Sequence, residues 1–296
     1  MGEGIVGEGD GELRMGESSG VMVLGGLEEA AGRAGCCMES FGFELDVFGR
    51  RARFRVSAGR GQARLSDITP LARRLSSEIV LLVVEGLRRR GEYVACCKGC
   101  SRCCSYLVPL SVPEAFRFRE EVQSLLGERG RSVLRDCLNT AQKILDGGVT
   151  GSTLGEEDGA DGGMELRRVA EWYGGLGARC PLLSGGLCSW YERRPVVCRE
   201  HIVTGSALAC RAEQTDFSHV APMPVSIVQA LGELTAELEG SEVEAVMLPL
   251  AFAWAEDNVE RSERTWPAEF MVERFVEILK SMASSDSRLC GVAAAS

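Results

Sequence analysis

Apolar and polar residues alternate along residues 41–56, and this alternation predicts a β-hairpin. The apolar positions recur at every second residue on both sides of a turn near Gly49: Phe41, Phe43, Leu45, Val47, Phe54 and Val56. Because successive side chains of a strand point to opposite faces, a period of two places these residues on one face. We therefore expect two paired strands with one buried face.

The apolar period then changes to that of a helix. Between Ser66 and Gly91 the helical spacing passes through Leu71, Leu75, Ile79, Leu82 and Val83. A Ser or Asp at the start and a Gly at the end are typical helix boundaries. Ser111 and Glu114 have the spacing of a capping box, which predicts that another helix begins there. A further helix is expected over residues 131–146.

Residues 147–163 are rich in glycine and predict a loop or linker, and a short helix should follow it. The last third of the chain reads as helical. A second capping-box pattern, Ser241 with Glu244, predicts a helix that is bent or broken at Pro249. Pro267 suits the first position of a final helix.

These elements predict an α+β fold with an N-terminal β-hairpin, a cysteine-rich metal-bound core with irregular loops, and surrounding helices. The expected regions are a flexible acidic, glycine-rich tail (1–38), the hairpin with a helix (39–93), a cysteine-cluster metal-binding domain (94–215) and a C-terminal helical region (216–296).

Composition narrows the class of protein. Hydrophobic residues make up 45% of the 296 residues and charged residues 26%, which is typical of a globular chain. The net charge of -10 argues against nucleic-acid binding, because that needs clustered Lys and Arg. The most apolar run, residues 78–87, is too short to span a membrane, and the N-terminus lacks the pattern of a signal peptide. We expect a soluble cytoplasmic protein that binds neither nucleic acid nor membrane.

The chain has 13 cysteines, and nine of them form two groups. The first group is Cys96, Cys97, Cys100, Cys103 and Cys104, and the second is Cys180, Cys188, Cys198 and Cys210. Two residues between cysteines let a turn bring both sulfurs onto one metal ion, and Cys97, Cys100 and Cys103 have this spacing twice. In a reducing compartment a disulfide framework is disfavoured. The pattern therefore predicts metal ligands, for an iron–sulfur cluster or for zinc.

Cys103 and Cys104 are expected to serve different centres, because neighbouring side chains diverge. Eight ligands would then form two four-thiolate centres, with either Cys96 or Cys97 left over. The remaining thiols are expected to be inert or incidental: Cys36, Cys37, Cys137 and Cys290.

The second group has neighbours that suit a metal site. Pro195 could open a helix that places Cys198 in its first turn, where the helix dipole favours the thiolate. Arg193, Arg194 and Arg199 could offset the charge of the thiolates, or be ordinary surface residues, and Trp190 and Tyr191 would exclude water. His201 could replace a thiolate, donate a hydrogen bond to one, or be purely structural; His219 has less support.

These residues resemble the YkgJ-type cysteine-cluster family, described as a zinc- or iron-chelating domain. The resemblance covers residues 94–212. Its pattern is matched by Cys100, Cys103, Cys104, Cys180, Pro181, Cys188, Tyr191, Glu192, Arg194, Pro195, Cys198 and Arg199, with Cys210 where a further cysteine often follows. The resemblance implies metal binding.

The cysteine pattern is also similar to that of flagellin lysine-N-methylase, which implies an iron–sulfur cluster used with S-adenosylmethionine. The alternative to simple metal binding is therefore methyl transfer to lysine in an unknown protein substrate. A substrate pocket is then expected between the cysteines and residues 241–283. A third alternative is a structural or metal-handling protein that recruits a partner.

Overall fold

The computed structural model describes residues 21–24, 39–125, 127–147, 162–206, 210 and 219–290 of the chain. Cys36, Cys37 and most of the glycine-rich segment 147–163 lie outside this part. The expected tail (1–38) also lies outside it, except that Val21–Leu24 forms a strand, β1.

The predicted β-hairpin is confirmed as β2 (Glu39–Val47) and β3 (Arg50–Ala58), which pair in antiparallel register. The last residue of β2 faces the first residue of β3, so the turn consists of Phe48 and Gly49 alone. Both have positive φ, 54° and 81°. Two-residue turns of this kind match the twist of the strands they join. β1 pairs in parallel with β3 and extends the hairpin to three strands.

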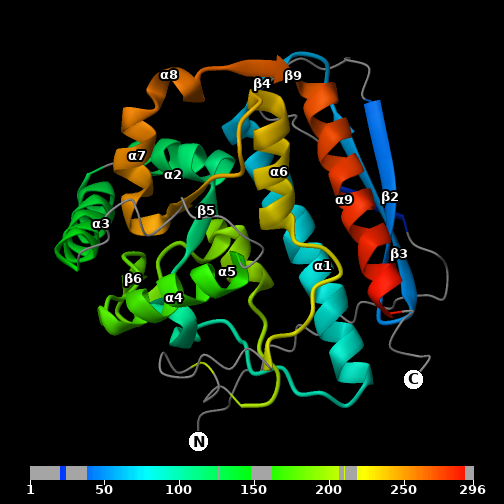
Figure 1. Cartoon of the computed structure of the whole chain (residues 1–296), viewed down its shortest axis with the longest axis horizontal. Coiled ribbons are helices and arrows are strands. Elements are labelled where there is room, and N and C mark those ends of the chain that lie inside the picture. Colours follow the sequence, from blue (N-terminus) through cyan, green and yellow to red (C-terminus); the bar gives the residue numbers. More distant parts are fainter. Residues whose placement is uncertain are drawn as a thin grey trace, which may run out of the picture.

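Helices cover the apolar face of this sheet (Figure 1). They are α1 (Thr69–Arg89) and α9 (Ala268–Cys290), of which α9 lies directly on β2 and β3, and α6 (Ile227–Glu239) packs on these two helices. Phe43 and Phe54 stack at the centre of the sheet face, with ring centroids 5.1 Å apart. Burying large apolar side chains from both layers is the main stabilisation of such a packing. The first core contains, among others, Leu71, Leu75, Ile79, Leu231, Leu234 and Phe275.

Other helices surround a second core, next to the cysteines (Figure 1). They are α2 (Val112–Ser124), α3 (Glu128–Asp146), α5 (Val196–Glu200) and α7 (Ala251–Asp257). α4 (Gly162–Gly175) packs against α3 in a separate cluster, and α8 (Val259–Ser262) follows α7. Three short antiparallel ladders complete the fold, two of them between distant segments and one a local hairpin. They pair β4 (Gln62–Arg64) with β9 (Thr265–Pro267), β5 (Pro109–Ser111) with β8 (Ala245–Met247), and β6 (Leu183–Ser184) with β7 (Leu187–Cys188).

The first predicted capping box is confirmed, and the second is wrong. Ser111 precedes α2, and its hydroxyl and N–H donate to Glu114 at 3.0 and 3.3 Å. Ser241, in contrast, follows the left-handed Gly240 that ends α6. Glu244 accepts a hydrogen bond from the Trp254 indole at 3.1 Å and pairs with Arg261, and the strand β8 follows it instead of a helix.

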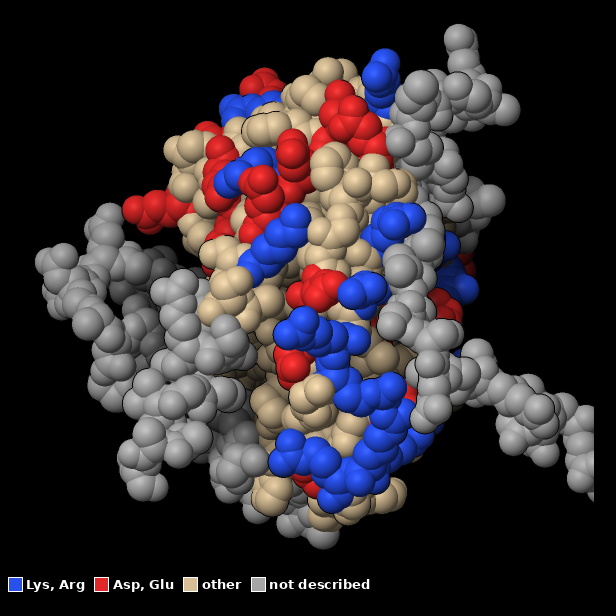
Figure 2. Space-filling model, turned by 90° about the vertical axis from the view of Figure 1, so that its right-hand side faces the viewer, with Lys and Arg blue, Asp and Glu red and all other residues tan. Residues whose placement is uncertain are grey.

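The surface of the sheet side carries arginines at one end (Figure 2). Exposed arginines stand at the end of α1 and at the hairpin turn, and the guanidinium of Arg90 lies 5.0 Å from the ring centroid of Phe48.

Within the described part of the chain, every helix is too short or too polar to cross a membrane.

Candidate metal centre

The segment that leads into the first cysteine group lies beside the segment that follows Cys198. Val94 and Thr204 form an antiparallel β-bridge, and the N–H of Ala95 donates to the carbonyl of Val203 at 2.9 Å. Two segments far apart in the sequence are thus joined through their backbones at the point where the first cysteine follows.

The thiol of Cys96 takes part in this joint. Its sulfur accepts the N–H of Val203 at 3.3 Å and lies 3.8 Å from the carbonyl oxygen of His201. Burial raises the pKa of this thiol, the Val203 N–H lowers it, and the thiols of Cys103 and Cys100 raise it again. A thiol that is partly buried, close to other thiols and already hydrogen-bonded to an N–H suits a metal ligand.

A tight turn separates Cys97 from Cys100. The N–H of Cys100 donates to the carbonyl of Cys97 at 3.1 Å, and Gly99 has φ 91°, the conformation expected for a glycine in such a turn. Cys97 and Cys100 are both exposed.

A 3₁₀ turn, Arg102–Ser105, then presents two half-buried cysteines. A hydrogen bond between the thiols of Cys103 and Cys104 raises the pKa of Cys103 far above its usual value, and burial adds to this effect.

The second cysteine group is joined to this turn through the backbone. The N–H of Cys180 donates to the carbonyl of Cys104 at 2.7 Å. Leu183 and Cys188 face each other in the β6–β7 ladder, whose turn consists of Gly185 and Gly186 with φ 59° and 81°. The hairpin reverses the chain direction, so that Cys188 at its end comes back near Cys180, which precedes its start.

Cys198 is the third residue of α5, as Pro195 predicted, although the helix is only five residues long and Pro195 precedes it as the cap. Burial raises the pKa of the Cys198 thiol well above its usual value. Further increases come from its neighbours Cys180, Cys103, Glu114 and Cys188.

The influence of the thiols on one another's pKa divides them into two overlapping sets. Burial and then Cys96, Cys103 and Cys100 raise the pKa of Cys210 to about 11. Burial and then Cys188 and Cys103 raise the pKa of Cys180 to about 11 as well. Cys103 thus lies within electrostatic range of both sets. The first set is Cys96, Cys100, Cys103 and Cys210, and the second is Cys103, Cys180, Cys188 and Cys198.

The thiols of the described cysteines are free. The ten cysteines of the described part whose side chains are placed form no disulfide. Among the described residues, no three His, Cys, Asp or Glu side chains are grouped closely enough to hold a metal ion. Two distant segments are therefore brought together, although the described residues form no such group.

Of the arginines expected to offset the thiolate charge, Arg194 is the one placed to do so. Its charge lowers the pKa of Cys96 and Cys103, against the larger effects of burial and neighbouring thiols. Its guanidinium lies 4.4 Å from the ring centroid of Tyr191. The ammonium of Lys98, which belongs to the first cysteine segment, lies 5.2 Å from the same centroid. Tyr191 thus connects cations of both cysteine segments.

Arg199 has a structural role instead. It is buried, and it donates to the carbonyls of Glu192 and Arg194 at 2.6 and 3.0 Å and to the hydroxyl of Ser77 at 2.7 Å. These bonds fix the loop before α5 against α1.

Two buried carboxylates hold the two ends of α5, and no sequence pattern indicates this role. Glu114 of the capping box also accepts the N–H of Val196 at 2.8 Å, and Glu200 accepts the N–H of Ile227 at 2.9 Å. Burial raises the pKa of Glu200 to about 7. The helix that carries Cys198 is thereby fastened to α2 at its start and to α6 at its end.

Trp190, expected to exclude water, lies in the second core with Cys180, Cys188 and Cys198 at its edge. Its indole N–H donates to Glu121 at 3.3 Å, and Glu121 forms a buried ion pair with Arg73 at 2.7 Å. The sequence pattern missed this ion pair, because its partners lie on different helices.

His201 lies next to the first set of thiols. Its ring meets the edge of Tyr106 with centroids 5.7 Å apart, and burial lowers its pKa. Its Nε2 is buried, with no hydrogen-bond partner in the described part. The carbonyl of His219 accepts the N–H of Thr204 at 2.8 Å, which gives this residue a backbone role.

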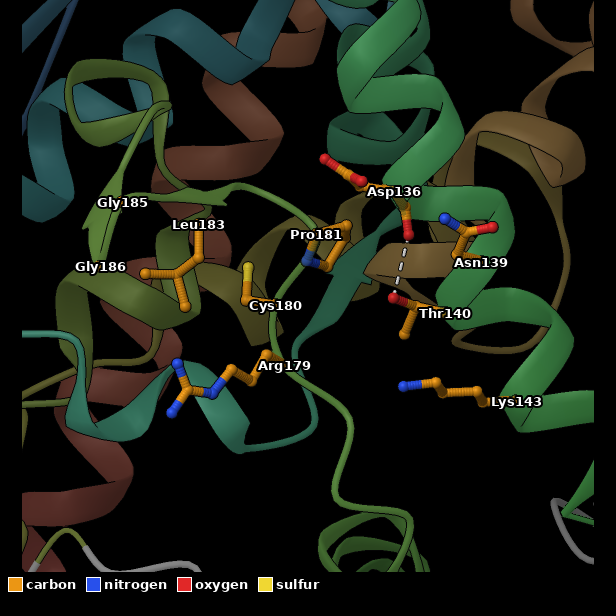
Figure 3. Close-up of a pocket in the computed structure, with 10 residues that line it drawn as sticks. All are labelled: Asp136, Asn139, Thr140, Lys143, Arg179, Cys180, Pro181, Leu183, Gly185 and Gly186. Carbon is orange, nitrogen blue, oxygen red and sulfur yellow. Dashed lines mark hydrogen bonds between the residues drawn. The ribbon is translucent and has the colours of Figure 1, made fainter.

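An open hollow of about 340 Å³ lies beside Cys180, between α3 and the β6–β7 hairpin (Figure 3). A pocket was expected between the cysteines and residues 241–283 instead. A hollow of about 410 Å³ does include residues 241–244 and Arg261, but no cysteine lines it. The residues of α3 that line this hollow were not singled out from the sequence, because its polar positions resemble any solvated helix face.

Comparison of the chain with protein-family models, curated proteins and solved structures gave no match. The resemblance to the YkgJ-type family therefore stays a prediction.

Proposed function

We propose that the chain is a metal-binding protein whose clustered cysteines coordinate an iron–sulfur cluster or zinc. The observation that carries the proposal is the backbone joint between the two cysteine segments, at Ala95 with Val203 and at Cys104 with Cys180. This joint places thiols that are far apart in the sequence within electrostatic range of one another.

The donor set fits such a group. Thiolates are the preferred ligands of zinc and of iron–sulfur clusters. Partly buried thiols that raise one another's pKa stay protonated until a cation offsets their repulsion, so metal binding would release their protons. The buried Nε2 of His201 is a further nitrogen without a partner in the described part of the chain.

The two thiol sets suggest which residues would hold the metal. Cys96, Cys100, Cys103 and Cys210 would serve one centre. Cys180, Cys188 and Cys198 would serve the other. Because Cys103 belongs to both sets, its neighbour Cys104, whose carbonyl accepts the N–H of Cys180 at 2.7 Å, would be the fourth ligand there. The bound group would supply a redox-active or Lewis-acidic centre. The protein residues would hold it, with Arg194 offsetting thiolate charge and Trp190 closing the apolar side.

Oxygen-free purification, with visible spectra and quantification of iron, acid-labile sulfide and zinc, tests the proposal. We expect either brown protein containing sulfide or colourless protein containing zinc. Cys100→Ser and Cys198→Ser should each lower the metal content, whereas Cys137→Ser, which alters a buried thiol outside both sets, should not. A metal-free wild-type chain would overturn the proposal.

The methyltransferase alternative also stays a prediction. Its test is incubation of metal-loaded protein with S-adenosylmethionine and a lysine-rich protein, with methyl transfer as the readout. Absence of both transfer and cofactor binding would remove it.

A further inference from the structure

The first cysteine group contains one tight turn that has a cysteine at each end. Residues 97–100 read Cys-Lys-Gly-Cys, and the N–H of Cys100 donates to the carbonyl of Cys97 at 3.1 Å. Gly99, the third residue of the turn, has φ 91°, which is the pattern of a type II turn. In such a turn the Cα atoms of the first and fourth residues lie within about 7 Å of each other.

This separation suits a disulfide. The Cα atoms of a disulfide lie about 4.4–6.8 Å apart, so the turn can keep its backbone while only the side-chain torsions of Cys97 and Cys100 change. Adjacent cysteines such as Cys103 and Cys104 have Cα atoms only about 3.8 Å apart, which is too close for an unstrained bond. The turn is therefore the place in the first group where a disulfide fits the backbone.

Exposure also distinguishes these two cysteines. Of the ten cysteines whose side chains the structure describes, Cys97 and Cys100 are exposed, and the others are half-buried or buried. Thiol–disulfide exchange needs an open approach to the attacking sulfur. A dissolved disulfide therefore reaches this pair before the other described thiols.

The two thiols differ in their relation to the other cysteines. Cys100 belongs to the first thiol set, because it raises the pKa of Cys96 and Cys210, whereas Cys97 belongs to neither set. A bond between Cys97 and Cys100 would thus take one thiol out of the first set and leave the other three in place.

We propose that Cys97 and Cys100 form a dithiol that exchanges with a small disulfide of the glutathione class, and that its closure withdraws Cys100 from the first thiol set. The Cys97 thiolate attacks one sulfur of the external disulfide, whose S–S bond breaks and releases one thiol. The Cys100 thiolate then attacks the Cys97 sulfur of the mixed disulfide and releases the second thiol. Two electrons pass to the external disulfide, and the two released thiols carry the protons of the dithiol.

The consequence for a bound metal rests on the proposed function, because Cys100 is a proposed ligand. Closure of the disulfide would leave the first centre with three of its four thiolates. In metal-loaded protein the disulfide and free metal should therefore appear together. Prior chelation should speed closure, because the metal competes for the Cys100 sulfur.

Peptide mapping detects the bond directly. Full-length protein purified without oxygen is incubated with oxidised glutathione, its remaining thiols are alkylated, and it is digested with trypsin. Cleavage after Lys98 places Cys97 on peptide 91–98 and Cys100 on peptide 99–102, so the disulfide joins these two peptides. We expect this linked pair to form about tenfold faster than any other disulfide of the chain, since its thiols are the accessible ones.

Variants assign the bond to its residues. The longer peptide also carries Cys96, so Cys97→Ser should abolish the linked pair and Cys96→Ser should keep it. Gly99→Ala should slow the linking about tenfold, because alanine disfavours the positive φ that the turn requires. The matched control is Gly240→Ala, which places the same strain at φ 65° at the end of α6 and should leave the rate unchanged.

The inference is overturned if oxidised glutathione leaves the two peptides unlinked, or if Cys97→Ser links them as the wild type does. Metal content is measured on the same samples. A linked pair in a wild-type chain that holds no metal after oxygen-free purification would refute the proposed function and leave the exchange standing. Metal-loaded protein that stays unlinked, both before and after chelation, would do the reverse.

Discussion

Cys96 and Cys97 have different environments in the structure, although the sequence alone does not distinguish them as candidate ligands. The sulfur of Cys96 is partly buried and bound to the N–H of Val203, while Cys97 is exposed at the start of a turn. A thiol that is already desolvated and oriented requires less reorganisation when it becomes a ligand. If the first group binds metal as proposed, this comparison favours Cys96 as the ligand and Cys97 as the extra cysteine.

We therefore predict that Cys96→Ser lowers the metal content and that Cys97→Ser does not. If each thiol set holds a separate centre, the Cys96 variant should lose about half of the bound metal, because only the first set is affected. Iron, sulfide and zinc analysis under oxygen-free conditions measures this. Equal losses in both variants would contradict the assignment.

At the scale of elements, a buried ion pair between α1 and α2 is bonded to Trp190, which packs beside the second cysteine group. Glu121 of α2 pairs with Arg73 of α1 at 2.7 Å and accepts the indole N–H of Trp190 at 3.3 Å. Glu121→Gln would leave the guanidinium of Arg73 buried without its counter-charge. We predict a loss of about 3 kcal/mol in the free energy of unfolding, because breaking one partner of a buried pair is costly.

Urea unfolding measures that loss. The matched control is Glu277→Gln, whose ion pair with Arg274 is exposed and should contribute less than about 1 kcal/mol. A Glu121 variant as stable as the control would show that the buried pair contributes little.

Local patterns in the sequence predicted some elements and failed at others for a physical reason. The alternation around Gly49 and the pair Ser111–Glu114 are satisfied by neighbours in sequence, so their elements could be predicted. Ser241 and Glu244 have the same spacing, but pairing between β5 and β8 prevails over a helix there. The joint at Cys104 and Cys180 depends on long-range contacts, as does the hollow on α3, and no local pattern encodes them.

At the scale of the whole molecule, charge is unevenly distributed. The chain has a net charge of -10, yet exposed arginines gather at the end of α1 and at the hairpin turn (Figure 2). Part of this charge is neutralised, since Arg89 pairs with Glu85, Arg90 with Glu92 and Arg53 with Glu44.

We predict that duplex DNA is not bound at about 0.15 M salt, where screening limits electrostatic attraction to about 8 Å. A mobility-shift titration tests this. A shift that is lost in Arg88→Glu would contradict the prediction and would locate binding at this end.

Two apolar clusters border the cysteines: Cys96 packs against the larger one, and three cysteines of the second group line the smaller one. The sheet with α1, α6 and α9 packs as a large apolar cluster, while Cys180, Cys188 and Cys198 line the smaller cluster around Trp190. Segments 94–105 and 178–206 have little regular structure, and a few backbone bonds join them. A bound metal would add its binding free energy mainly to this part of the fold.

Removing the metal should therefore loosen the molecule locally. We predict that chelation speeds hydrogen exchange at the amides of Ala95, Cys100, Cys104 and Cys180, whereas α1, α6 and α9 stay protected, because regions with few buried contacts open independently of the core. Hydrogen-exchange mass spectrometry of metal-loaded and metal-depleted protein measures this. Faster exchange throughout the chain would instead mean that the metal stabilises the whole fold, and unchanged exchange at these amides would mean that they do not depend on a metal.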